Sequence, residues 1–200
     1  ASPNYPDGVV YVDGYMINYG AEAPPSVDYT VTPTLNDGNL VLNGGFEEAA
    51  GKLPRYWTTR DNTTGDPATF NLTSDSKAGE YAIEITDNAN SRGSIISNYF
   101  PVEPNKTYLV SAYAKVSNSS YKARIWILES DANKESETGT MLAETNSTSY
   151  TRISAVHKIA STKKWARIEL TSDAAGEKSV YFDNVRVIQI ENEGDTFPED

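Results

Sequence analysis

Three segments of the chain alternate small apolar side chains with aromatic and charged ones. The aromatic or charged positions are Tyr113 and Lys115, then Arg124 and Trp126, then Trp165, Arg167 and Glu169. Because side chains on a strand point to opposite faces in turn, one face of each segment carries this second set. An aromatic ring stacks on the apolar C–H face of a sugar ring, and charged side chains bind its hydroxyl rim. We therefore predict that these seven residues bind a carbohydrate ligand.

Two other interpretations of these faces stay open. A loop or the N-terminal part of the chain could cover them and form a second packed layer. Each tryptophan could also be a core residue, and for Trp57 we expect a place in the core. Tyr56 and Trp57 lie in a predicted loop, from which they could also flank the edge of a ligand site.

The elements that position these residues are predicted to be strands. Helical periodicity is nearly absent; the nearest candidate, 131–144, has too few apolar residues for a core-facing stripe. Short runs rich in Val, Ile, Tyr and Thr recur between turn-forming clusters. The predicted strands are 8–17, 40–42, 68–73, 81–87, 93–100, 106–116, 121–130, 148–159, 166–172 and 179–190. This pattern predicts an all-β fold, a β-sandwich of two antiparallel sheets.

Composition and charge exclude several classes of function. The chain of 200 residues has no cysteine, which excludes disulfides, thiolate metal sites and a cysteine nucleophile. Its formal net charge of -11 disfavours nucleic acid and anionic membrane surfaces as partners. No apolar run approaches the length of a membrane span, so we expect no membrane insertion.

No catalytic residues are predicted. His157 is the only histidine, lies in a predicted strand and has no Gly-x-Ser-x-Gly motif to accompany it, so we expect a structural role. Abundant carboxylates leave a glycosidase pair open in principle, but no segment concentrates them in an aromatic-lined cleft. No glycine-rich phosphate loop follows a strand.

Two short segments of the chain have similar sequences, and this internal repeat bears on domain organisation. Residues 9–17 (V-V-Y-V-D-G-Y-M-I) parallel residues 179–187 (S-V-Y-F-D-N-V-R-V). The first copy could be the last strand of a preceding module, an extra strand of the main domain, or a chance match. We predict an N-terminal extended arm or linker over 1–38, a main domain over 39–190 and an acidic tail over 191–200.

Five pieces, in order, resemble the jelly-roll carbohydrate-binding modules grouped around families 4, 9, 16 and 22. They read N-L-V-L-N-G-G-F-E (39–47), L-P-R-Y-W (53–57), A-G-E-Y-A-I-E-I (78–85), T-Y-L-V-S-A-Y-A-K (107–115) and V-Y-F-D-N-V (180–185). The resemblance covers about Asn39 to Ile190 and implies a jelly-roll sandwich. It also implies that the three predicted ligand-binding strands share one concave sheet.

The resemblance further implies a structural Ca²⁺ ion where the first and last strands meet. Glu47 lies in the matched N-G-x-F-E piece and Asp183 in the matched Y-F-D-N piece. Because Ca²⁺ takes six to eight oxygen ligands, we expect Gly45 and the turn that contains Glu80 to contribute as well. Alternatively, Asp183 caps a β-bulge and Glu47 is solvated.

These observations predict a non-catalytic module that binds a polysaccharide or a cell-surface glycan. Its expected setting is extracellular, within a larger secreted, cell-surface or virion protein. The alternative is a structural module that joins subunits of a virion, filament or surface layer without binding sugar. The arm could connect to neighbouring modules or donate its first strand to another subunit.

Overall fold

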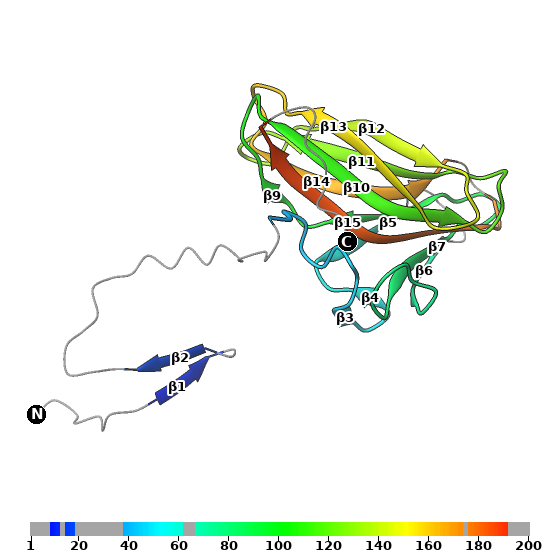
Figure 1. The fold of residues 1–200 in the computed structure, drawn as a ribbon, viewed down its shortest axis with the longest axis horizontal. Coiled ribbons are helices and arrows are strands. Elements are labelled where there is room, and N and C mark those ends of the chain that lie inside the picture. The colour runs from blue at the N-terminus through cyan, green and yellow to red at the C-terminus, as the bar shows by residue number, and fades with distance from the viewer. Residues whose placement is uncertain (1–8, 13–14, 19–37, 62–66, 174–175, 192–200) are drawn as a thin grey trace, which may run out of the picture. The chain divides into compact units, whose positions relative to one another are not determined.

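The structure is a computed structural model, and it describes residues 9–12, 15–18, 38–61, 67–173 and 176–191. Every regular element within these ranges is a β-strand, and all pairings are antiparallel (Figure 1). The predicted all-β sandwich is therefore confirmed. None of the described residues forms a helix long and apolar enough to cross a membrane.

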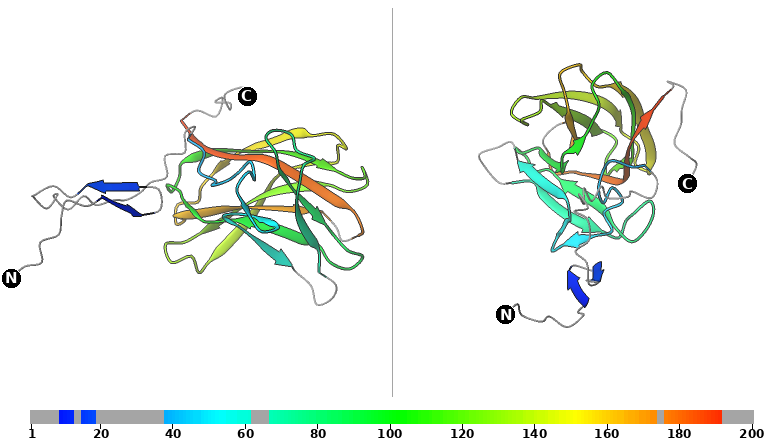
Figure 2. Two further views of the ribbon diagram at one scale, coloured as in Figure 1. Left: turned by 90° about the horizontal axis from the view of Figure 1, so that it is seen from below. Right: turned by 90° about the vertical axis from the view of Figure 1, so that its left-hand side faces the viewer.

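Two sheets form the main unit, Leu35–Asp200, and Figure 2 shows them from two further directions. The five-stranded sheet has the order β13-β10-β15-β7-β6, which are Thr151–Lys158, Thr107–Val116, Ser179–Ile190, Ala82–Thr86 and Thr69–Thr73. The six-stranded sheet has the order β12-β11-β14-β8-β5, which are Glu137–Thr145, Ala123–Ser130, Trp165–Ser172, Gly93–Ser97 and Trp57–Asp61; β9 (Phe100–Pro101) also pairs with β14. A small hairpin joins β3 (Ala49–Ala50) to β4 (Leu53–Pro54).

The N-terminal unit, Ala1–Thr34, contains a hairpin of β1 (Val9–Val12) and β2 (Tyr15–Asn18). The sequence predicted one strand over 8–17, whereas the structure divides this stretch in two. The two strands pair antiparallel, with Val9 opposite Asn18 and Val12 opposite Tyr15. The predicted linker, strand donation by the arm and the acidic tail lie largely outside the described residues.

The main unit differs from the predicted elements in several places. Residues 131–144, the weak helix candidate, contain the edge strand β12, whose side chains are mostly polar. Strand β5 was not predicted, because only Trp57 in it is a large apolar residue. Residues 40–42 were predicted to form a strand but form part of a turn. The Leu40 N–H donates to the Val187 carbonyl of β15, but no continuous strand pairing follows.

The core lies between the two sheets. Trp57 is 4% exposed and packs on Phe46, with ring centroids 5.1 Å apart, and its indole N–H donates to the Asn43 carbonyl at 3.1 Å. Trp57 is therefore a core residue, as expected from the sequence. His157 of β13 lies 3.5 Å from the Glu129 carboxylate of β11, so these two side chains approach each other from the two sheets.

A bulge in β15 ties the start of the main unit to its end. The β10–β15 register shifts between Ser111 and Tyr113, which leaves Asn184 and Val185 outside the ladder. Asn184 adopts a positive φ of 46°, as one residue of a bulge often does. The freed Val185 N–H donates to the Gly44 carbonyl at 2.8 Å, and the Val185 carbonyl accepts from the Asn39 amide at 3.0 Å.

We predict that Asn39→Ala destabilises the protein strongly. The Asn39 side-chain oxygen also accepts from the backbone N–H groups of Val41 and Val187, so the change removes partners from several buried backbone groups. The expected loss is about 3 kcal/mol of unfolding free energy, measured by urea denaturation. Asn146→Ala, at an exposed asparagine, is the control and should change stability by less than about 0.5 kcal/mol. Equal effects of the two variants would contradict this role for Asn39.

Candidate glycan-binding groove

The outer face of the six-stranded sheet carries a row of side chains centred on Trp126. Trp126 of β11 lies opposite Glu169 of β14 on one side and Met141 of β12 on the other. One step along the strands, Arg124 lies opposite Thr171 and Glu144. The Arg124 guanidinium donates to the Glu144 carboxylate at 2.8 Å. An aromatic residue therefore sits in the middle of this face among polar ones.

A pocket of about 390 Å³ opens on this face. Its lining residues are Arg60, Arg92, Trp126, Leu128, Glu137, Gly139, Glu169 and Thr171. The volume lies at the small end of the range of about 300–1,000 Å³ seen for small-molecule sites. Its mixture of one large ring, two guanidinium groups and two carboxylates suits a ligand with an apolar face and many hydroxyl groups.

Arg60 crosses the face from one edge of the sheet to the other. It belongs to the edge strand β5, and its guanidinium lies 3.3 Å from the Glu137 carboxylate on the opposite edge strand, β12. The same guanidinium lies 3.6 Å from the Glu169 carboxylate on β14. A side chain can connect the two edges only if the sheet is strongly curved, so this face is concave.

One end of the concave face is filled by a cluster of Tyr99, Glu137, Trp165 and Arg167, called the end cluster below. The Arg167 guanidinium donates to both Glu137 carboxylate oxygens, at 2.6 and 2.8 Å, and the Tyr99 hydroxyl donates to one of them at 2.8 Å. The Lys134 ammonium lies 3.9 Å from the centre of the Trp165 ring. Beneath this cluster, the outer-facing Ser130 is 0% exposed.

These contacts hold Glu137 in its charged form. Burial alone would raise the pKa of Glu137, but hydrogen bonds from Arg167 and Tyr99 and the charge of Arg60 outweigh it, so the pKa is lowered. Glu137 is therefore ionised at neutral pH and acts as the common acceptor of the end cluster.

Five of the seven residues predicted to bind ligand lie on this six-stranded sheet, on β11 and β14: Arg124, Trp126, Trp165, Arg167 and Glu169. Of these, Trp126 and Glu169 line the pocket. Trp165 and Arg167 belong to the end cluster and contact protein groups instead.

Tyr113 and Lys115 lie elsewhere, and the prediction that they share this face is wrong. They belong to β10, in the five-stranded sheet. There the segment 75–77 covers them: Asp75 pairs with Lys115, and the Lys77 ammonium lies 5.1 Å from the Tyr113 ring centre. The alternative interpretation, a face covered by a loop, describes these two residues.

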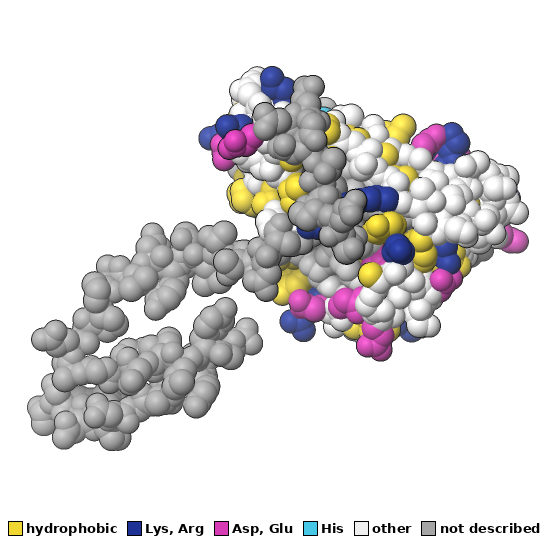
Figure 3. Space-filling model, viewed as in Figure 1, with side chains coloured by type: hydrophobic (Ala, Val, Ile, Leu, Met, Phe, Trp, Pro, Cys, Tyr) yellow, Lys and Arg dark blue, Asp and Glu magenta, His cyan; other side chains and the backbone are white. Residues whose placement is uncertain are grey.

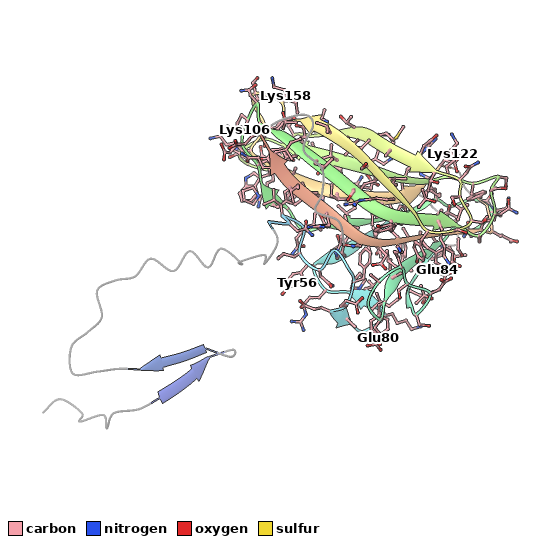
Figure 4. All side chains as sticks on the ribbon, viewed as in Figure 1. Tyr56, Glu80, Glu84, Lys106, Lys122 and Lys158 are labelled. Carbon is pink, nitrogen blue, oxygen red and sulfur yellow. The ribbon has the colours of Figure 1, made fainter. Side chains whose placement is uncertain are left out.

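Lys115 is held between two tyrosine rings, those of Tyr150 and Tyr181, each with its centre 4.8 Å from the ammonium. The Tyr181 hydroxyl donates to the Glu84 carboxylate at 2.7 Å; Glu84 is labelled in Figure 4. Burial and this hydrogen bond raise the pKa of Tyr181 to about 12.

Figure 3 shows hydrophobic side chains interspersed with charged ones on the face that it views.

Sequence reasoning missed the three other charged residues of the pocket: Arg60, Arg92 and Glu137. Arg60 and Glu137 lie on β5 and β12, two strands that the hydrophobic pattern did not predict. Without these edge strands, neither residue could be placed on the concave face. The only available signal for them was a charged residue in a polar segment, which is typical of loops as well.

The residues expected to bind Ca²⁺ lie around the turn 77–81. Asp183 is 0% exposed, and its carboxylate accepts the backbone N–H groups of Lys77 at 2.7 Å and Ala78 at 2.9 Å. The Glu47 carboxylate accepts those of Glu80 at 2.9 Å and Tyr81 at 3.2 Å. Asp183 also flanks the β-bulge, as the alternative interpretation expected.

These groups fit a Ca²⁺ ion only in part. Each carboxylate keeps at least one lone pair beyond its hydrogen bonds. Burial is the main cause that raises the pKa of Asp183, and the nearby charge of Glu47 raises it further. A cation between them would relieve this repulsion. Among the described residues, however, no three His, Asp or Glu side chains gather to hold a metal, so backbone carbonyls such as that of Gly45 would have to complete the shell.

Glu80, labelled in Figure 4, is a weaker candidate ligand than expected. Its backbone N–H, rather than its carboxylate, faces Glu47. Its carboxylate instead interacts with the Tyr81 hydroxyl and raises the pKa of that group.

We predict that Glu137→Gln lowers stability at neutral pH and that its effect fades in acid. Because the folded-state pKa of Glu137 lies below its ordinary value, the ionised group adds stability above that value and loses it as pH falls through the folded-state pKa. The measurement is the unfolding free energy in urea from about pH 7 to about pH 3.5. Glu135→Gln, at an exposed glutamate, controls for the lost charge. An unchanged difference between wild type and Glu137→Gln across this range would contradict the assignment.

Comparisons with known proteins agree with this architecture. The family model CBM_4_9, described as "Carbohydrate binding domain", matches residues 38–176. No curated protein matches the sequence. Among solved structures, the bacteriophage CBA120 tailspike protein 4 enzymatically active domain aligns with a TM-score of 0.59 and 16% identity. The alignment covers 76% of this chain and 22% of the tailspike chain, so the likeness spans only a small part of that protein.

Two isolated modules align over nearly their full length. The C-terminal family 22 carbohydrate binding module of Clostridium thermocellum Xyn10B gives a TM-score of 0.54 at 14% identity, covering 78% of this chain and 96% of the module. TmCBM61, solved in complex with β-1,4-galactotriose, gives 0.53 at 14% identity, covering 76% and 99%. At such identities these likenesses show the fold alone. The family match, which covers more than half of the chain, shows that this protein belongs to the CBM_4_9 family of carbohydrate binding domains.

Proposed function

We propose that the concave face of the six-stranded sheet binds a polysaccharide or cell-surface glycan and carries out no catalysis. The observation that carries this proposal is the position of Trp126, a half-buried ring that lines a pocket among guanidinium and carboxylate groups. Its ring offers a stacking surface for the C–H face of a sugar. Family membership supports the same function.

The polar groups around Trp126 suit recognition of hydroxyl groups. Glu169, directly opposite Trp126, accepts hydrogen bonds, whereas Arg60 and Arg92 donate them. Arg124 lies next along β11 and is held by Glu144. A charged side chain that a partner already orients, such as Arg124, loses little conformational freedom when a sugar binds, which favours affinity.

The lowered pKa of Glu137 supports a non-catalytic role. A glycosidase needs one carboxylic acid whose pKa is raised so that it can protonate the leaving group. The pKa of Glu137 is lowered instead, because hydrogen bonds from Arg167 and Tyr99 and the charge of Arg60 outweigh the effect of its burial. This carboxylate is therefore a hydrogen-bond acceptor and does not meet that requirement.

We predict that Trp126→Ala weakens glycan binding by at least about tenfold, a loss of about 1.4 kcal/mol, without unfolding the domain. The measurement is retardation in gels containing soluble xylan, galactan or mixed-linkage glucan, after a glycan array selects the polymer class. Tyr113→Ala, at an aromatic residue of the other sheet, is the matched control and should bind as wild type does. Binding that survives Trp126→Ala but is lost in Tyr113→Ala would place the site on the five-stranded sheet and contradict the proposal.

The setting that we propose is extracellular, within a larger secreted, cell-surface or virion protein. The likeness to modules of glycan-degrading enzymes and to part of a phage tailspike supports it. If no glycan is retained by a folded protein that self-associates, a structural module in an assembly becomes the better description.

We further propose that Ca²⁺ binds beside Glu47 and Asp183 and stabilises the turn 77–81. Excess Ca²⁺ should then raise the melting temperature relative to excess chelator, because a ligand that binds only the folded state stabilises it. Glu47→Gln should reduce this increase, whereas Glu48→Gln, at the exposed neighbouring residue, should keep it. Identical melting temperatures in Ca²⁺ and chelator would exclude the site.

A further inference from the structure

We infer that the groove receives the end of a glycan chain, or a short side branch, and does not accommodate the middle of a long chain. This inference rests on the proposed function and adds the class of ligand. It follows from the ion pair that crosses the concave face and from the end cluster beside it.

The crossing ion pair divides the face. Arg60 comes from one edge strand and Glu137 from the other, and their side chains meet at 3.3 Å over the strands between them. Two outer-facing side chains of those strands are buried: Ile96 is 3% exposed and Leu128 is 4% exposed. An open groove along the whole face would leave such residues accessible to a sugar chain.

Protein groups fill the space on one side of the crossing. Glu137 accepts hydrogen bonds from Arg60, Arg167 and Tyr99 together. The Arg167 guanidinium also lies 4.6 Å from the centre of the Tyr99 ring. Charge-assisted and bidentate contacts of this kind are the strongest hydrogen bonds that side chains make.

The end cluster is fixed from further directions as well. Lys134 covers the Trp165 ring, and the Lys163 ammonium donates to the Ser136 carbonyl at 2.8 Å, which fastens the loop that carries Lys134. The Lys134 ammonium therefore competes with a sugar ring for one face of Trp165. A chain that extended beyond Trp126 in this direction would have to displace several ion pairs.

Space remains on the other side of the crossing. The pocket there is bounded by Trp126, Thr171 and Arg92, and its volume of about 390 Å³ suits a short piece of chain. A sugar stacked on Trp126 would meet the Arg60–Glu137 pair at one side and solvent at the other. A site that is closed on one side and open on the other suits the end of a chain, because the terminal sugar has no neighbour on the closed side.

The test is a titration calorimetry series with defined linear oligosaccharides and the matching unbranched polymer. The probes are xylo-, galacto- and cello-oligosaccharides of increasing length, used with the whole 200-residue chain. In an open groove, each further sugar that adds about 1 kcal/mol would raise the affinity about fivefold. We expect the affinity to stop rising after the first few units and the stoichiometry to stay at one protein per chain end, up to the polymer.

The variant that tests the cause is Glu137→Ala, which removes the common acceptor of Arg60, Arg167 and Tyr99. In this variant the affinity should continue to rise with chain length beyond the point at which wild type stops. Thr138→Ala, the next residue along β12 and exposed, is the control and should match wild type.

Several outcomes overturn the inference. Many wild-type molecules bound along one unbranched polymer chain, or an affinity that keeps rising through the longest oligosaccharide, would overturn it while leaving the proposed function intact. Failure to bind any glycan would overturn the proposed function, and this inference with it. If Glu137→Ala does not fold, the wild-type stoichiometry decides the question alone.

Discussion

The bulge in β15 is the constraint on which the rest of the main unit depends. By removing Asn184 and Val185 from the β10 ladder, it frees backbone groups that bind Gly44 and Asn39 and so fasten the start of the domain to its last strand. Asp183, at the same bulge, accepts hydrogen bonds from the backbone N–H groups of Lys77 and Ala78 and so holds the start of the turn 77–81. One local irregularity therefore organises three segments that are far apart in sequence.

Charge pairing on the six-stranded sheet has a different role. Several charged side chains crowd a concave face, where low solvent access makes an unpaired charge costly. Glu137 resolves this by accepting from two arginines and a tyrosine at once. The same contacts that stabilise these charges occupy part of the face, so the requirement for pairing limits where a ligand can lie.

The interior strands were predictable from sequence, whereas the two edge strands of the six-stranded sheet, β12 and β5, were not. Strands β10, β11 and β14 are buried on one face and alternate clearly, so their positions and their core residues follow from periodicity. Strand β12 lies at an edge, and its polar side chains obscured the pattern. Trp126 and Glu169 were thus found, but Arg60 and Glu137 were missed. Tyr113 was misplaced because alternation identifies a face without identifying the sheet to which the strand belongs.

The features that fix the fold and those that form the groove lie on different sheets. The contacts of Asn39, Asp183 and Glu47 belong to the five-stranded sheet and the segments beside it, whereas Trp126, Glu169 and Arg60 belong to the other. Substitutions in the groove therefore need not disturb the contacts that hold the chain together.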